Sequence, residues 1–142
     1  NPNAVLRPFH LAFPVGDLDA AHRFYTSVLG CAPGRRAERW ADFDFFGHQI
    51  SAHLVDIAPE PAATNAVDRR LVPARHFGVI LAWDDWQDLV ARLGRAAVEW
   101  LIEPTIRFAG EVGEQATCFI LDPSGNALEF KAFRDDDRIF AH

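Results

Sequence analysis

The sequence repeats one order of elements, and this repeat is the feature that most limits what the chain can fold into. In each half, a strand containing a His is followed by a helix that begins at an Asp and ends at a Gly, and then by strands joined at a Gly turn. Self-similarity of this kind indicates repeated supersecondary units. The sequence therefore predicts an α+β fold made of two βαβββ modules. The matching positions are His10 with His76, Asp17 with Asp84, Gly30 with Gly94, Gly47 with Gly125 and, roughly, His53 with Glu129.

The spacing of apolar residues predicts where the elements lie. A stripe at helical spacing predicts a helix over Leu18–Leu29, and a second helix is expected over Trp86–Leu93, ending at Gly94. Asp17 and Asp84 are the expected N-caps. Alternating or short continuous apolar runs predict strands. The expected strands are Phe9–Val15, Trp40–Phe46, Gln49–Val55, His76–Leu81, Ala97–Ile102 and the two strands of the hairpin Thr117–Lys131. Loops are expected at Cys31–Arg39 and around Pro104, Gly110 and Gly113.

The length of 142 residues is enough to bury a core, so we expect a single domain over residues 1–142. Module one spans about residues 8–56 and module two spans about residues 76–133. The segment between them, about residues 57–75, is rich in Pro and Ala and shows no clear period. Long segments of this kind are usually linkers or lids, and we expect a linker here.

The last hairpin carries an unexpected charge. A turn signal at Asp122–Asn126, which combines Asp, Pro, Gly and Asn, joins its two apolar runs. In the second run Glu129 alternates with Leu128 and Phe130, so its carboxylate should point to the opposite face. A carboxylate on an otherwise apolar strand is costly unless it is solvated, paired or bound to a metal.

Composition and charge exclude several classes of partner. The net charge of −6 and the pI near 5.4 argue against nucleic acid or an anionic membrane as the main partner. The sequence shows neither an apolar run of membrane-spanning length nor a signal peptide. It contains no Met, so Asn1 is not expected to be the translation start, and a cytoplasmic location is the default expectation. Two cysteines, Cys31 and Cys118, are too few for a disulfide framework or a thiolate metal site. Cys118 lies on an apolar strand and is expected to be a buried thiol.

The repeat also brings candidate metal ligands together. If approximate two-fold symmetry relates the modules, His10 faces His76, and Glu129 lies on a neighbouring strand. Two imidazoles and one carboxylate are the facial set of non-haem iron(II), and manganese, nickel or zinc can also use it. Taken singly, each His can be a structural residue and Glu129 a solvated one. Their matched places in a repeated unit favour a metal site.

Several runs of the sequence carry a family resemblance. They are His10–Ala21, Phe24-Tyr25 with Leu29-Gly30, His76–Gly78, and Asp122–Asn126 with Glu129-Phe130. Over about Phe9–Phe133 the chain resembles the vicinal oxygen chelate superfamily, which includes glyoxalase I, type I extradiol dioxygenases, and fosfomycin and bleomycin resistance proteins. Two further runs, Asp42–Gln49 and Gly113–Gln115, look like a subgroup known as predicted extradiol-type dioxygenases.

The resemblance implies a curved mixed sheet around a divalent metal held by His10, His76 and Glu129. In glyoxalase I a Glu or Gln at the position of His53 is a fourth ligand, and a carboxylate there serves as the base. A His at this position argues against glyoxalase activity and fits an extradiol-like site, where a His near the metal is an acid or base. The further candidates for binding substrate are Gln49, Ser51, Trp40, Phe119 and Arg107.

We therefore expect a metal-dependent, dioxygenase-like enzyme that acts on a small molecule chelating the metal through adjacent oxygens. Iron(II) is the preferred metal, with manganese, nickel or zinc as alternatives. One alternative function is a glyoxalase-, epimerase- or thiol-transferase-like enzyme. Another is a metal-free protein that sequesters a ligand in an aromatic groove using Trp40 and Phe119, as bleomycin resistance proteins do. The resemblance also implies a homodimer, with the site either within one chain or shared across a swapped pair.

Overall fold

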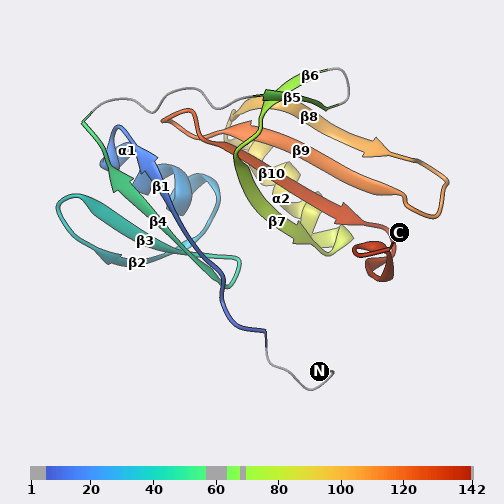
Figure 1. Cartoon of the computed structure of the whole chain (residues 1–142), viewed down its shortest axis with the longest axis horizontal. Coiled ribbons are helices and arrows are strands. Elements are labelled where there is room, and N and C mark those ends of the chain that lie inside the picture. Colours follow the sequence, from blue (N-terminus) through green and yellow to red (C-terminus); the bar gives the residue numbers. More distant parts are fainter. Residues whose placement is uncertain (1–5, 57–63, 68–69, 142) are drawn as a thin grey trace. The chain divides into compact units, whose positions relative to one another are not determined.

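A computed structural model describes residues 6–56, 64–67 and 70–141. The chain divides into two compact units, Asn1–Pro59 and Glu60–His142, and each is described by itself. Figure 1 labels the elements along the chain. In unit 1 they are β1 (His10–Val15), α1 (Leu18–Arg23), the π-helical turn η1 (Phe24–Val28), β2 (Ala32–Arg36), β3 (Trp40–Phe45) and β4 (His48–Leu54). In unit 2 they are β5 (Thr64–Val67), β6 (Arg70–Pro73), β7 (His76–Leu81), α2 (Trp83–Arg95), β8 (Glu99–Arg107), β9 (Gln115–Leu121), β10 (Ala127–Phe133) and the 3₁₀ turn η2 (Asp136–Arg138).

Unit 1 is a four-stranded sheet with a helix on one face. The strand order is β1-β4-β3-β2, in which β1 pairs with β4 in parallel and the other pairs are antiparallel. The core lies between the sheet and the helical segment, where the fully buried Tyr25 ring packs against Phe13 and Phe43, with ring centroids 5.4 and 5.2 Å away. The opposite face of this sheet is therefore the one available for function.

Unit 2 repeats the plan of unit 1. Its main sheet has the order β7-β10-β9-β8, again with one parallel pair, β7 with β10. Helix α2 covers one face, and Trp86 Nε1 donates a hydrogen bond of 2.8 Å to the Phe130 carbonyl oxygen. The two matching sheets, each with one helix between its first and second strands, confirm the predicted α+β fold of two βαβββ modules.

The segment expected to be a linker contains strands where the structure describes it. Strands β5 and β6 pair antiparallel, and residues 57–63 and 68–69 lie outside the described part. Val72 of β6 is buried against Phe119 and Ile102, so long-range packing stabilises a pairing that the local sequence does not signal. Short strands held by such contacts show little period of their own.

Two segments expected to be loops are edge strands. Strand β2 occupies most of Cys31–Arg39, and β8 extends through Pro104 to Arg107. Every residue of β2 is exposed, so it has no apolar alternation to detect. The register of β8 shifts between Ile102 and Thr105, and this irregularity at a sheet edge accommodates the proline.

The predicted N-cap is correct for α1 and wrong for α2. The Asp17 carboxylate accepts a hydrogen bond from the Ala20 N–H and caps α1 as predicted, although the last part of the expected helix is the π-helical turn η1. The N-cap of α2 is Ala82, which makes no side-chain capping bond, and Asp84 lies within the first turn. An acidic side chain there still favours the helix dipole. The helix also continues one residue past Gly94.

The turn expected at Asp122–Asn126 is confirmed. The Asp122 carboxylate accepts hydrogen bonds from the backbone N–H groups of Ser124 and Asn126, and Gly125 adopts a φ of 85°. The turn fixes the register of β9 and β10, and with it the position of Glu129.

Candidate functional site

In unit 2 the site centres on a His and a Glu from adjacent strands. His76 begins β7 and Glu129 lies in the middle of β10, which runs parallel to it. The Nε2 atom of His76 lies 3.4 Å from Oε1 of Glu129. The two side chains are 28% and 17% exposed, so both are partly shielded from water while remaining accessible.

Each of these two side chains is held by a second contact. His76 donates from Nδ1 to the Pro73 carbonyl oxygen over 2.8 Å, and Thr117 Oγ1 donates to Glu129 Oε2 over 2.6 Å. The Phe119 ring packs edge-on against the imidazole, with ring centroids 5.0 Å apart. A proton on Nδ1 leaves a lone pair on Nε2 when the ring is neutral. His76 Nε2 and Glu129 Oε1 are thus the atoms of this pair that lie close together and are not used in the two supporting hydrogen bonds.

Gly78 allows β7 to approach β10 beside Glu129. A Cβ atom at this position would lie 1.5 Å from the Glu129 carbonyl oxygen, far closer than any side chain can be. Gly78 and Glu129 are also partners in the strand register. The close approach of β7 to β10 beside Glu129 therefore depends on a glycine in β7.

In unit 1 the corresponding sheet face carries a different set of side chains. His10 donates from Nδ1 to the Gln49 side-chain oxygen over 2.8 Å, so Nε2 is the ring nitrogen that this bond does not use. Ser51 Oγ donates to Asp42 Oδ1 over 2.5 Å. His53 is exposed and lies two residues beyond Ser51, so it shares this face.

The strand registers identify which residues correspond between the units. His10 begins β1 and His76 begins β7; two residues later, Ala12 pairs with Ser51 and Gly78 pairs with Glu129. Ser51 is therefore the counterpart of Glu129, two residues before the position expected from the rough alignment with His53. Unit 1 has a hydroxyl where unit 2 has a carboxylate.

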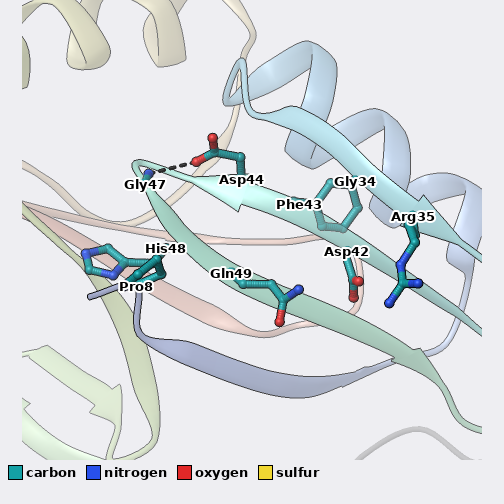
Figure 2. A pocket seen from close by; sticks show the side chains of 9 residues that line it. All are labelled: Pro8, Gly34, Arg35, Asp42, Phe43, Asp44, Gly47, His48 and Gln49. Carbon is teal, nitrogen blue, oxygen red and sulfur yellow. Dashed lines mark hydrogen bonds between the residues drawn. The ribbon is translucent and has the colours of Figure 1, made fainter. Parts of the chain in front are cut away.

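A depression of about 350 Å³ lies on β2, β3 and β4 of unit 1. Figure 2 shows Arg35, Asp42 and Gln49 projecting to the same side of the sheet, while Asp44 accepts a hydrogen bond from the Gly47 N–H. Gln49 is the predicted substrate-binding residue found in its lining. The depression thus adjoins the partner of His10.

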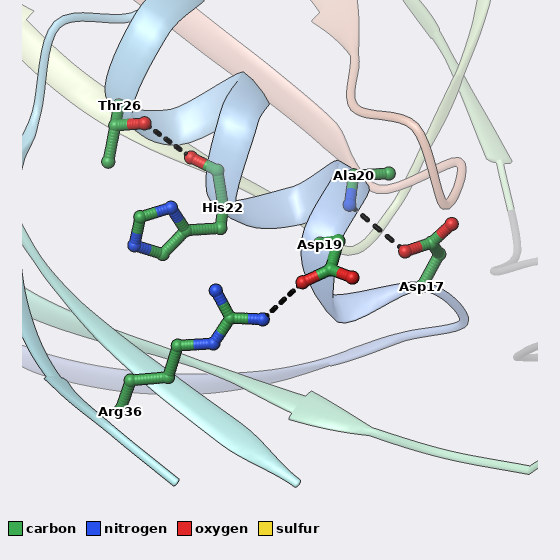
Figure 3. Close-up of polar contacts among 6 residues, drawn as sticks. All are labelled: Asp17, Asp19, Ala20, His22, Thr26 and Arg36. Carbon is green, nitrogen blue, oxygen red and sulfur yellow. Dashed lines mark hydrogen bonds and ion pairs between the residues drawn. The ribbon is translucent and has the colours of Figure 1, made fainter. Parts of the chain in front are cut away.

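Polar contacts around α1 fix this helix to its sheet and lie outside the predicted site. Figure 3 shows Asp17 capping the helix and Arg36 of β2 paired with Asp19. The hydrogen bond and the charge of Arg36 hold the pKa of the Asp19 carboxyl below its usual range. These contacts serve the architecture of unit 1.

Comparison with known proteins identifies the family. The Glyoxalase/Bleomycin resistance protein/Dioxygenase superfamily matches residues 7–130. The chain belongs to this superfamily. A glyoxalase/bleomycin resistance protein/dioxygenase from Alicyclobacillus acidocaldarius has a crystal structure with 34% identity and a TM-score of 0.80, and the match covers 99% of this chain and 98% of that one.

Two other proteins match this chain with lower identity. Virulence protein STM3117 of Salmonella typhimurium is 25% identical over 124 residues, which are 87% of this chain and 82% of that protein. The fosfomycin resistance protein FosX from Listeria monocytogenes shares the fold, with 16% identity, a TM-score of 0.69, and coverage of 96% of this chain and 100% of that one. Across the residues that the structure describes, no helix is both long and apolar enough to cross a membrane.

The superfamily contains metalloenzymes, and its members typically bind a divalent metal. His76 and Glu129 fit this role, because two ligands about 2.1 Å from one metal are separated by about 3.0–3.4 Å. Their contacts to Pro73 and Thr117 are of the kind that orient metal ligands. Among its described residues, neither unit alone gathers three His, Cys, Asp or Glu side chains that could hold a metal ion. The third predicted ligand, His10, belongs to unit 1.

The remaining predicted residues have distinct surroundings. Trp40 lies opposite His53 in the strand register. Phe119 is only 1% exposed, so it supports the His76 ring rather than offering surface to a ligand. Arg107 is the last residue of β8 instead of a loop residue, and its guanidinium lies 5.3 Å from the Phe108 ring centroid.

Sequence reasoning missed two polar partners, Thr117 and Asp42. Each lies on a strand adjacent to the residue it contacts, and on the same face. Period-two alternation along β9 and β3 could have suggested both.

Cys118 makes no contribution to the chemistry of this face. It is fully buried, as predicted, and burial raises the pKa of its thiol to about 12, with a smaller effect of the Glu129 charge in the same direction. The thiol is therefore neutral at physiological pH and is not available as a thiolate ligand or nucleophile.

Proposed function

We propose that this chain is a metal-dependent enzyme of the superfamily with extradiol-dioxygenase-like chemistry, using His10, His76 and Glu129 as ligands. The observation that carries the proposal is the arrangement of His76 and Glu129. Their lone-pair atoms lie 3.4 Å apart, and the other polar atom of each side chain is already engaged. Iron(II) is the metal we propose, because two imidazoles and a carboxylate are its facial set.

A bound divalent metal would supply a Lewis acid and open positions for two adjacent oxygens of a small substrate, such as a catecholate or an enediolate. The chain's own contribution begins with the ligand set, which is kept in place by the Pro73 carbonyl, Thr117 and Phe119. His53 is proposed to hold and transfer a proton, because an imidazole can do both near neutral pH.

Two observations favour this function over the alternatives. In a glyoxalase-like enzyme a carboxylate serves as base, but the unit 1 counterpart of Glu129 is Ser51, and the side chain two residues further on the same face is His53. A ligand-sequestering protein would need an aromatic groove, but Phe119 is buried against His76. Both observations support metal-assisted chemistry with a histidine as acid or base.

The test is elemental analysis of the protein purified without added metal, compared with Glu129→Gln. We expect about one iron or manganese per chain in the wild type and loss of most of it in the variant. Glu99→Gln, which changes an exposed carboxylate at the start of β8, is the matched control and should keep its metal. A wild-type protein without metal would contradict the proposal and favour ligand sequestration.

The reaction class is tested with catechols in the presence and absence of oxygen. Ring cleavage should consume oxygen and stop under strict anaerobiosis. Activity on enediolate-forming substrates that survives anaerobiosis, with nickel or zinc bound, would instead assign glyoxalase-like isomerisation.

A further inference from the structure

The face of the unit 2 sheet that carries Glu129 also carries a cation that is not one of the proposed metal ligands. Lys131 lies on β10 two residues beyond Glu129, and it is the single lysine of the chain. Along this strand Leu128, Phe130 and Ala132 are buried on the side of α2. On the other side Glu129, Lys131 and Phe133 are half-buried. Lys131 and Glu129 therefore project from the same face of the sheet.

The surroundings of the Lys131 ammonium leave it available to an anion. Nζ lies 5.9 Å from the Phe133 ring centroid, and no ion pair of Lys131 with a carboxylate is found among the described residues. Its register partners on the flanking strands are Thr117 and Ile80, neither of which carries a charge. A half-buried cation with no ion pair among the described residues, on the same face of the sheet as Glu129, is placed to meet an anionic ligand.

The position of Lys131 on β10 sets the distance between its ammonium group and a metal-bound part of a ligand beside Glu129. Two residues of a strand span about 7 Å, so a ligand chelated beside Glu129 would reach the ammonium with a group about 7 Å away. One aromatic ring or a short chain covers this separation. Arg107 lies on the same face but two strands away, on β8, and is therefore the more distant cation.

We propose that Lys131 anchors a carboxylate of the substrate, so that the enzyme acts on small acids whose carboxylate stands opposite their two metal-chelating oxygens. The inference rests on the proposed metal site for the other end of the ligand. A carboxylate fits better than a phosphate because one ammonium matches a single negative charge, whereas phosphate sites commonly use bidentate arginine or several donors.

The test compares two probes that differ in one charge. 3,4-Dihydroxybenzoate and its methyl ester are titrated into the metal-loaded protein under anaerobic conditions, with affinities measured by calorimetry. We expect the wild type to bind the acid at least about tenfold more tightly than the ester, as a charge-assisted hydrogen bond implies. Lys131→Met should lower affinity for the acid to that for the ester, and Lys131→Arg should retain most of the preference.

Two controls separate the outcomes. Arg95→Met removes an exposed cation from α2, on the covered side of the sheet, and should leave the preference unchanged. Metal content is measured for every variant: a wild type without metal would refute the proposed function itself. Full metal content with equal affinity for both probes, or with the same preference in Lys131→Met, would overturn only the role of Lys131.

A second readout uses the single lysine directly. Reductive methylation with ¹³C gives one lysine dimethylamine signal beside that of the chain's α-amino group. This signal should shift as the acid is added and should not shift with the ester. A lysine signal that stays fixed while the acid binds would also overturn the proposal.

Discussion

The two units share one backbone plan and differ in the side chains that occupy it. Each has a four-stranded sheet with the same strand order and one parallel pair, a helix on one face of that sheet, and a His at the start of the first strand of that sheet. In unit 2 that His meets a carboxylate, whereas in unit 1 it meets the amide of Gln49. At the register position of Glu129, unit 1 has Ser51 bonded to Asp42.

The difference shows how a repeated fold can divide its tasks. Gln49 can orient the His10 ring, but an amide is a weaker metal ligand than a carboxylate. Unit 2 provides an imidazole nitrogen and a carboxylate oxygen 3.4 Å apart. Unit 1 provides the imidazoles of His10 and His53 and the hydroxyl of Ser51. On the proposed function, unit 2 supplies most of the metal site and unit 1 supplies the remaining ligand and the acid or base.

The largest effect is expected where unit 2 has a glycine and unit 1 has a residue with a side chain. Unit 1 has Ala12 at the position of Gly78, and a Cβ at Gly78 would lie 1.5 Å from the Glu129 carbonyl oxygen. Gly78→Ala should therefore separate β7 from β10 and destabilise unit 2 by about 3 kcal/mol. Urea unfolding followed by circular dichroism measures the change. Gly113→Ala, where nothing lies within 4 Å of the added Cβ, is the control, and equal effects of the two would refute this account.

The next effect tests whether both units are needed for metal. His10→Ala in unit 1 and Glu129→Ala in unit 2 should each retain less than about a tenth of the wild-type metal, since either change removes a direct ligand. His22→Ala replaces a histidine of α1 and should keep its metal. A His10→Ala variant with full metal content would show that unit 2 binds the metal without unit 1.

Mixing these two variants sharpens the same comparison. If the site is shared across a swapped dimer, each heterodimer contains one intact site, and refolding an equal mixture should restore about a quarter of the wild-type metal. If the site lies within one chain, the mixture should restore none.

A smaller effect is expected from the partners that orient these groups. Thr117→Val removes the hydroxyl that donates to Glu129 and keeps the side-chain shape, so metal affinity should fall by about tenfold. Ser51→Ala removes a hydroxyl of unit 1 that donates to Asp42 and should leave metal affinity within about twofold. Competition with a chelating dye measures both variants. Equal losses would mean that Ser51 also acts on the metal site.

Sequence reasoning succeeded where the signal is local. The Asp122 turn, the Asp17 cap and the alternation around Glu129 each depend on a few neighbouring residues, and the structure confirms them. The repeat gave the fold because two copies of one pattern reinforce each other. The family resemblance gave the candidate ligands.

The missed features depend on contacts distant in sequence. Strand β2 pairs with β3 although it is exposed throughout, and β6 is held by the packing of Val72 on Phe119. The sequence matches Glu129 roughly with His53, whereas the strand register matches it with Ser51, two residues earlier. Only the register reveals this, because it depends on how the strands pair. Lys131 gives no signal in the sequence, because its alternation with apolar residues is the same as that of a solvated strand position.

The last comparison concerns the two helices. Helix α1 has a side-chain N-cap at Asp17, whereas α2 begins at Ala82 without one and has Asp84 in its first turn. Asp17→Ala leaves the Ala20 N–H without its acceptor and should destabilise α1 by about 1 kcal/mol. Asp84→Ala removes only a favourable charge at the helix dipole and should cost about 0.5 kcal/mol. Hydrogen exchange followed by mass spectrometry should show roughly fivefold faster exchange in α1 for Asp17→Ala, and a smaller change in α2 for Asp84→Ala. An equal or larger effect of Asp84→Ala would mean that the charge at the helix dipole, rather than the capping hydrogen bond, determines how these helices begin.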